Sequence, residues 1–258
     1  MAHLPVLATA GRSYVFAWKN LGSAFRLAWL PFLVASLPWP PGEAIGAAWW
    51  LASPLLLLLA AIVATVKAVC SSLVTVALMR VVLFDRRAAA TLLPPSIEPV
   101  HVLVVAVYLG LGLLAFLMEG VLAVANVALP IPTANAAFLL LPAAYIYVGA
   151  RLFTLDAAVV VSGRLPLRET WRHAAGNWWR LFALMLLCSA PALLLPSKFG
   201  SVASEIGAAD FALNSDAATT LATTLIEFVV GLPLAALNAA ATCYAFKALA
   251  GIPPDATV

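Results

Sequence analysis

Five ionisable side chains lie inside stretches of the sequence that are otherwise apolar. They are Lys67, Glu119, Arg151, Asp156 and Glu227. Charged groups in such stretches are costly, and they mark either ion and proton pathways or buried ion pairs. Lys67 falls near the middle of its stretch, at a depth from which it can reach Glu119 or Glu227, whereas Arg151 and Asp156 fall near an inner end. One hypothesis is a proton- or ion-coupled pathway; the other, which we favour, is an ion pair that fixes helix packing.

Residues that would support catalysis or metal binding do not cluster. The candidates are His3, His101, His173, Cys70, Cys188 and Cys243. The histidines are far apart, and no pair of cysteines has the spacing of metal ligands. Motifs of nucleotide-binding loops, serine hydrolases and zinc proteases are absent from the sequence. We therefore expect no enzymatic activity, no cofactor and no metal, and we expect the cysteines to be small packing residues.

The composition excludes an ordinary water-soluble domain. Hydrophobic residues make up 64% of the chain and charged residues 10%, with a mean hydropathy of +1.05, whereas soluble domains carry about 25% charged residues. The sequence predicts a multi-pass membrane protein. Its net charge of +3 then reflects orientation and anionic lipid head groups rather than nucleic acid.

Six apolar stretches have the length of about 20 residues that a membrane crossing requires. They are roughly Leu21–Leu37, a part of Ala47–Phe84, Val100–Val127, Ala136–Val161, Trp178–Leu195 and Ala217–Ala248. We interpret the second as one long helix with Pro54 near its outer end. The predicted fold is an all-α transmembrane bundle of six helices, forming a single integral membrane domain over residues 1–258.

The basic residues gather in alternate gaps between these stretches, or at the ends of the chain. They are Arg12, Lys19, Arg26, Arg80, Arg86, Arg87, Arg164, Arg168, Arg172, Arg180 and Lys247. Lys198 lies in one of the other gaps. Lysine and arginine favour cytoplasmic loops. With six spans, this pattern predicts that the N- and C-termini are both cytoplasmic.

Two segments on the predicted cytoplasmic side have the period of amphipathic helices. In the first, one side carries Leu7, Tyr14, Trp18, Leu21 and Phe25, while Arg12, Ser13, Lys19 and Asn20 point away. In the second, one side carries Leu167, Trp171, Ala174 and Trp178, opposite Arg168, Glu169, Arg172 and His173. We expect both to lie at the membrane interface. Their predicted contacts with lipid head groups are Arg12, Lys19, Arg26, Arg168, Arg172 and Arg180.

The chain contains two similar junctions between an interfacial segment and a span. Gly22-Ser23-Ala24-Phe25-Arg26-Leu27 parallels Gly176-Asn177-Trp178-Trp179-Arg180-Leu181. A glycine eases the bend into the bilayer, and the arginine can reach back to phosphates. The similarity favours a parallel internal repeat, an interfacial helix followed by a pair of spans, at residues 6–84 and 165–250. Chance similarity is the alternative.

The stretch from Arg151 to Leu181 resembles part of a bacterial six-span family. The resemblance rests on Arg151, on Asp156-Ala157-Ala158-Val159-Val160, on Pro166-Leu167-Arg168-Glu169-Thr170-Trp171 and on the Gly176–Leu181 junction. The family includes the membrane domain of some glycerophosphoryl diester phosphodiesterases and stand-alone proteins of unknown function. The resemblance implies a multi-pass protein of the bacterial inner membrane with a lipid or envelope role. The phosphodiesterase chemistry of that family belongs to a separate soluble barrel, so no catalytic residue is carried over.

Together these patterns predict a non-enzymatic inner-membrane protein that interacts with phospholipids or acts as an accessory component of envelope machinery. The first alternative is a small-solute or proton-linked transporter that uses Lys67, Glu119 and Glu227. The second is a structural subunit of a larger membrane complex, with a membrane protein as its partner. Small residues spaced for close helix packing support the second alternative: Ala235, Ala236, Ala239, Ala240 and Ala241.

Overall fold

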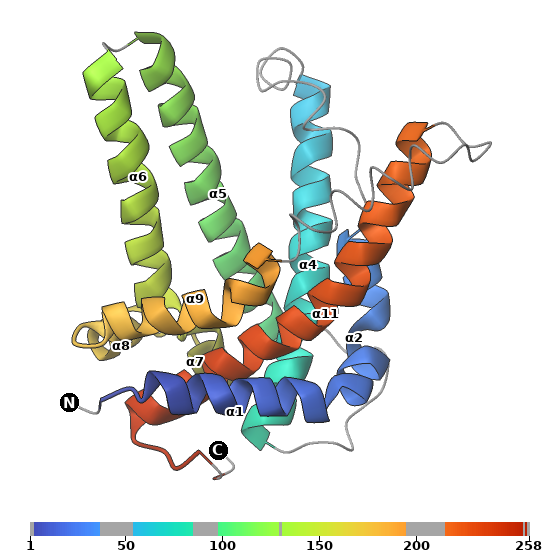
Figure 1. Cartoon of the computed structure of the whole chain (residues 1–258), viewed down its shortest axis with the longest axis vertical. Coiled ribbons are helices and arrows are strands. Elements are labelled where there is room, and N and C mark those ends of the chain that lie inside the picture. Colours follow the sequence, from blue (N-terminus) through green and yellow to red (C-terminus); the bar gives the residue numbers. More distant parts are fainter. Residues whose placement is uncertain are drawn as a thin grey trace.

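The computed structural model describes residues 3–36, 54–84, 98–128, 131–194, 215–254 and 256. The regular structure within these ranges is helical (Figure 1). Its helices are α1 (Val6–Lys19), α2 (Leu21–Ser36), α4 (Pro54–Phe84), α5 (Pro99–Ala128), α6 (Ile131–Leu152), α7 (Leu155–Ser162), α8 (Leu167–Ala174), α9 (Trp178–Leu194) and α11 (Ser215–Ala250).

Four segments of the described chain are helical, long enough and apolar enough to cross a membrane. They are Ala61–Phe84, Pro99–Met118, Phe138–Ser162 and Phe228–Ala250, and they overlap the second, third, fourth and sixth predicted stretches. In the described residues the second stretch is one helix, Pro54–Phe84, with Pro54 near one end, as predicted. With 16 and 17 residues, α2 and α9 are shorter than these four segments. Membrane crossing by the first and fifth stretches therefore stays a prediction.

Helices α4, α5 and α6 run in a different direction from α1, α8 and α9 (Figure 1). Figure 1 shows α4, α5 and α6 roughly upright, while α1, α8 and α9 lie crosswise to them near one end. The N- and C-terminal parts of the described chain lie toward that same end. The segments with the most basic residues are therefore gathered at one end of the bundle.

The C-terminal helix α11 is the central element of the packing. It contacts α1, α2, α4, α7, α8 and α9. Its second half buries a series of small residues: Ala236, Ala239, Ala240, Ala241, Cys243 and Ala245. Small side chains let helix backbones approach closely, so one helix can accommodate several neighbours. The close packing predicted for this alanine-rich face is present within the chain itself.

Helix α1 packs against α11 with a face that is also made of small residues. It buries Thr9, Ala10, Ser13 and Ala17 and packs against α11 and α9. The prediction that Ser13 points away on the polar side was wrong. Ser13 is fully buried, and its hydroxyl donates to the Thr9 carbonyl at 2.8 Å. That internal bond satisfies the hydroxyl, so a serine serves as a small packing residue here.

A glycine sets the contact between α2 and α11. The ring of Phe32 in α2 lies so close to Gly231 that a Cβ atom there would come within 2.6 Å of it. Phe228, one turn earlier in α11, packs against Phe25 and Phe32, with ring centroids at 5.6 and 6.1 Å. The missing side chain of Gly231 therefore makes room for an aromatic ring between the two helices.

The fourth predicted span contains a turn that sequence analysis did not predict. Helix α6 ends at Leu152, a turn occupies Phe153 and Thr154, and α7 begins at Leu155. Helix α7 packs against α4, α5, α8 and α11 and ends at Gly163, whose φ of 65° is left-handed. Glycine takes this conformation without steric cost. The break places Asp156 in the first turn of a separate, mostly buried helix.

The end of α11 is fastened by a backbone motif and a lysine. Gly251 has a φ of 72°, and the Ile252 amide donates to the Lys247 carbonyl at 2.8 Å, as in a Schellman motif. The buried Lys247 ammonium donates to carbonyls of Val82 in α4 and of Ala256, at 3.3 and 2.8 Å. A residue predicted to mark orientation therefore also joins the end of the chain to α4.

Enlarging a buried alanine of α11 tests whether this helix is the centre of the packing. We expect Ala240→Leu to lower the melting temperature in detergent or nanodiscs, because inserting methylene groups into a filled interface costs about 1–3 kcal/mol. The matched control is Ala144→Leu on the exposed surface of α6, which should leave the melting temperature nearly unchanged. An equal effect of both substitutions would contradict the assignment of α11 as the packing centre.

Candidate functional site

A cavity of about 740 Å³ lies between α4 and α5. Most of its lining is apolar, and its polar groups are Thr65, Lys67 and Ser71 from α4 and Tyr108 from α5. Gly112 on α5 also lines the cavity. The predicted intramembrane lysine therefore faces a cavity large enough for part of an amphiphile or a small solute.

The structure does not test the predicted partners of Lys67. Glu119 lies in α5 and Glu227 in α11, but both side chains lie outside the part of the structure that is described. An ion pair of Lys67 with either carboxylate stays a prediction.

A second polar group lies where α4, α5, α7 and α11 meet. Asp156 of α7 lies close to the Tyr108 hydroxyl and to Cys243. The Tyr108 hydroxyl donates to Thr75 Oγ1 at 2.6 Å. These residues are distant in the sequence, and only the break before α7 brings Asp156 among them. Sequence analysis named Asp156 as an intramembrane candidate but found neither Tyr108 nor Thr75.

Arg151 joins α6 to α8 through aromatic side chains. Its guanidinium lies 5.2 Å from the ring centroid of Tyr147 and 4.8 Å from that of Trp171. It also donates to the Tyr147 hydroxyl at 2.8 and 3.0 Å and to the Trp171 carbonyl at 3.0 Å. A planar guanidinium can stack and donate hydrogen bonds at the same time. The described contacts of this predicted intramembrane charge therefore fix the position of α8.

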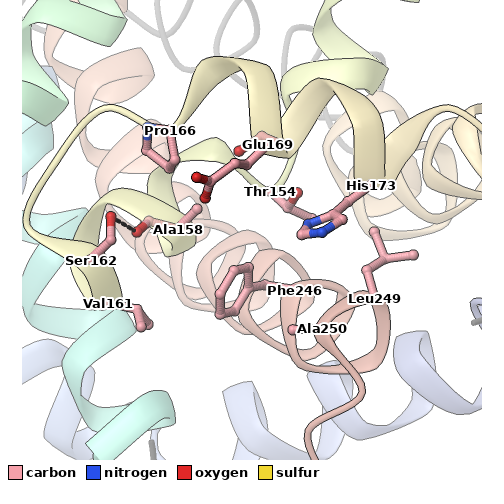
Figure 2. A pocket seen from close by; sticks show the side chains of 11 residues that line it. Thr154, Ala158, Val161, Ser162, Pro166, Glu169, His173, Phe246, Leu249 and Ala250 are labelled. Atoms are coloured by element: carbon pink, nitrogen blue, oxygen red, sulfur yellow. Dashed lines mark hydrogen bonds between the residues drawn. The ribbon is translucent and has the colours of Figure 1, made fainter.

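A small, mostly apolar pocket of about 140 Å³ lies between α7, α8 and α11 (Figure 2). Glu169 and His173 of α8 point toward it, with Phe246 of α11 on the facing side. Glu169 is held by Arg164 at 3.0 Å, and the Ser162 hydroxyl donates to the Ala158 carbonyl at 2.7 Å. The pocket is large enough for a small polar group.

The base of α5 carries an ion pair that sequence analysis missed. Arg80 of α4 makes a salt bridge with Glu98, the residue before α5, and the buried His101 accepts the Glu98 amide at 3.2 Å. His101 is the third residue of α5, where an acceptor side chain can satisfy the amide of the capping residue. Pro99, which has no amide to satisfy, opens the helix. This arrangement gives His101 a structural role at a helix start.

The predicted contacts with lipid head groups lie on or beside the crosswise helices. Arg12, Lys19, Arg26, Arg168 and Arg172 are exposed, and Arg180 is partly buried. Arg180 has internal partners: its guanidinium lies 2.6 Å from His3 Nδ1 and 3.3 Å from the side-chain oxygen of Asn177.

Asn177 is buried, and its side-chain oxygen also accepts the Leu4 amide at 3.3 Å. Arg180 therefore helps to fasten the start of the chain to α9. Its predicted contact with a head group stays a prediction.

No protein-family model, curated protein or solved structure matches this chain. Within the described residues, no group of three or more histidine, cysteine, aspartate or glutamate side chains could hold a metal ion. The three cysteines are free thiols, and Cys188 and Cys243 are buried, as expected of packing residues.

Removing the Arg151 guanidinium should loosen α8. We expect Arg151→Gln to speed tryptic cleavage at Arg164, Arg168 and Arg172, because the variant loses the stacking and the bond to the Trp171 carbonyl. Cation–π contacts alone contribute about 0.5–2 kcal/mol. Mapping the cleaved bonds by mass spectrometry measures the effect. The control is Arg12→Gln, which changes an exposed residue of α1. Unchanged cleavage in the Arg151 variant would contradict the claim that Arg151 fixes the position of α8.

Proposed function

We propose that this chain is a non-enzymatic protein of the bacterial inner membrane with six membrane spans that binds anionic phospholipids and serves envelope machinery as an accessory component. In this proposal, α1 and α8 are the two amphipathic interfacial helices, and both termini are cytoplasmic. The resemblance of Arg151–Leu181 to a bacterial six-span family agrees with such a role.

The surface of α1 is the observation that carries the proposal. Its large apolar side chains point away from the protein: Leu7 is 79% exposed and Trp18 is 82% exposed. Arg12 and Lys19 are exposed on the same helix. Exposed apolar area of this kind is unfavourable in water and favourable at a bilayer surface, where basic residues meet anionic head groups.

Contacts with the bundle hold this surface in place. The small buried face of α1 rests on α11 and α9, and the Tyr14 hydroxyl donates to the Leu187 carbonyl of α9 at 2.7 Å. An interfacial helix fixed to the protein presents its cations without the entropic cost of ordering a free segment. This supports lipid binding as a function of the folded protein.

The second helix offers a similar surface on a smaller scale. Arg168, Arg172 and Trp171 of α8 are exposed, and the pocket beside Glu169 and His173 opens next to them. The exposed arginines suit the phosphate of a lipid, and the pocket has room for part of its polar head group.

A transporter is the second candidate function. The observation that favours it is the 740 Å³ cavity between α4 and α5, because Lys67 and Tyr108 give a mostly apolar cavity two polar groups that could hold a solute. A chain that retains no lipid in the experiment below would favour this candidate over the first.

Native mass spectrometry of protein released from mixed nanodiscs, half phosphatidylglycerol and half phosphatidylcholine, tests the first candidate. We expect the wild type to retain phosphatidylglycerol preferentially, and Arg168→Gln/Arg172→Gln in α8 to weaken that preference. Each basic residue near an anionic surface contributes about 1 kcal/mol. Losing two should therefore weaken retention by about tenfold or more.

The control in the same helix is Arg168→Lys/Arg172→Lys, which keeps both positive charges and should leave most of the preference in place. The double change Arg12→Gln/Lys19→Gln should weaken retention in the same way from α1. Equal retention of both lipids by the wild type, or no effect of the substitutions by glutamine, would refute the proposal.

A further inference from the structure

One buried oxygen atom among the described residues lacks the partner that its chemistry requires. Asp156 Oδ1 is shielded from solvent and has no hydrogen-bond partner within the described structure. Buried carboxylate oxygens are normally paired with donors or with positive charge, because burying an unpaired charge is costly. This oxygen therefore requires an explanation.

The neighbouring hydroxyl groups do not give Asp156 Oδ1 a hydrogen-bond donor. Tyr108 interacts with Asp156, but its single hydroxyl proton can serve only Thr75 or Asp156 at one time. When the Tyr108 hydroxyl donates to Thr75 Oγ1, 2.6 Å away, the Tyr108 oxygen presents only lone pairs to the carboxylate. With the proton on Asp156 instead, Oδ1 still has no donor. Both arrangements leave an oxygen-rich site with uncompensated negative character.

The surroundings of Asp156 contain few charges that could compensate it. Among the described residues, α5 contributes Tyr108 and α11 contributes Cys243, while α4 contributes the neutral Thr75. On α8, Glu169 and His173 line the separate pocket of Figure 2. The Lys247 ammonium, one turn beyond Cys243, donates to three backbone carbonyls.

We propose that Asp156, Thr75 and Tyr108 form a binding site for one monovalent cation, either a proton or an alkali metal ion such as Na⁺. One carboxylate balances one positive charge, and hydroxyl oxygens are suitable further ligands for a hard cation. The site lies beside a broken helix, and broken helices frame the ion sites of many membrane proteins.

The site shares a residue with the larger cavity. Tyr108 interacts with Asp156 and also lines the space between α4 and α5 that Lys67 faces. A change in the cation at Asp156 alters the partner of the Tyr108 hydroxyl. The cation would therefore influence what the cavity binds. This coupling would act whether the cavity holds a lipid chain or a solute.

The test compares the wild-type protein with Asp156→Asn in nanodiscs. In sodium-free buffer near neutral pH, a bound proton predicts a carboxylic-acid C=O stretching band in the infrared spectrum of the wild type that is absent from the variant. A bound alkali ion predicts instead a melting temperature that rises with NaCl more than with choline chloride at equal ionic strength, and a loss of that rise in Asp156→Asn.

Two further variants keep the result interpretable. Tyr108→Phe, which removes one hydroxyl but retains the ring, should shift the band or reduce the sodium effect even if Asp156→Asn folds poorly. Glu169→Gln changes an exposed carboxylate and should leave both signals unchanged. A wild-type protein with neither the band nor the sodium effect would overturn the proposal, as would signals that both Asp156→Asn and Tyr108→Phe retain.

Discussion

The close approach of helices on α11 is the constraint on which the rest of the structure depends. A helix that contacts six others must present little side-chain volume on its buried faces, and the buried alanines of its second half meet this requirement. The buried residues of α1 are also small. At Gly231, the lack of a side chain leaves room for the ring of Phe32. Packing of small residues brings α1 onto the bundle, whereas the contacts of Arg151 fix the position of α8.

This packing decides which surfaces remain for function. Because α1 packs its small residues against the other helices, its large apolar and basic residues are exposed on the outer surface. The break between α6 and α7 has a comparable effect inside the bundle, since it lets a short helix carry Asp156 to Tyr108. The outer surface suits a lipid bilayer, and the inner site suits a small cation. Both follow from how a few small residues and one turn place polar groups.

Much of the helical architecture could be predicted from the sequence, because long apolar runs leave few alternatives to helices. The continuity of α4 through Lys67, with Pro54 near one end of the helix, was predicted correctly. The turn at Phe153 and Thr154 was not, since neither residue breaks a helix by itself and the apolar pattern continues through them. Ser13 was predicted on the exposed side because it is polar, but it is small enough to be buried at a helix contact.

The contacts of the candidate sites were the hardest features to predict. Asp156 was recognisable as an unusual charge, but Tyr108 and Thr75 join it through tertiary packing that one sequence does not reveal. Arg151 was recognised as a charge within a span, yet its stacking on Trp171 depends on α8 folding back beside α6. His101 offered a local signal, since its position three residues after Glu98 at a helix start is that of a capping pair.

The placement of α1 at the membrane surface is the central claim, and spin-label accessibility measures it most directly. Single cysteines at positions 12 and 18, introduced after replacement of Cys70, Cys188 and Cys243, would carry labels in nanodiscs. We expect the label at position 18 to be accessible mainly to oxygen dissolved in the bilayer. The label at position 12 should be accessible mainly to a water-soluble nickel chelate. Equal accessibility of both positions to the nickel chelate would contradict it, because Trp18 would then face water.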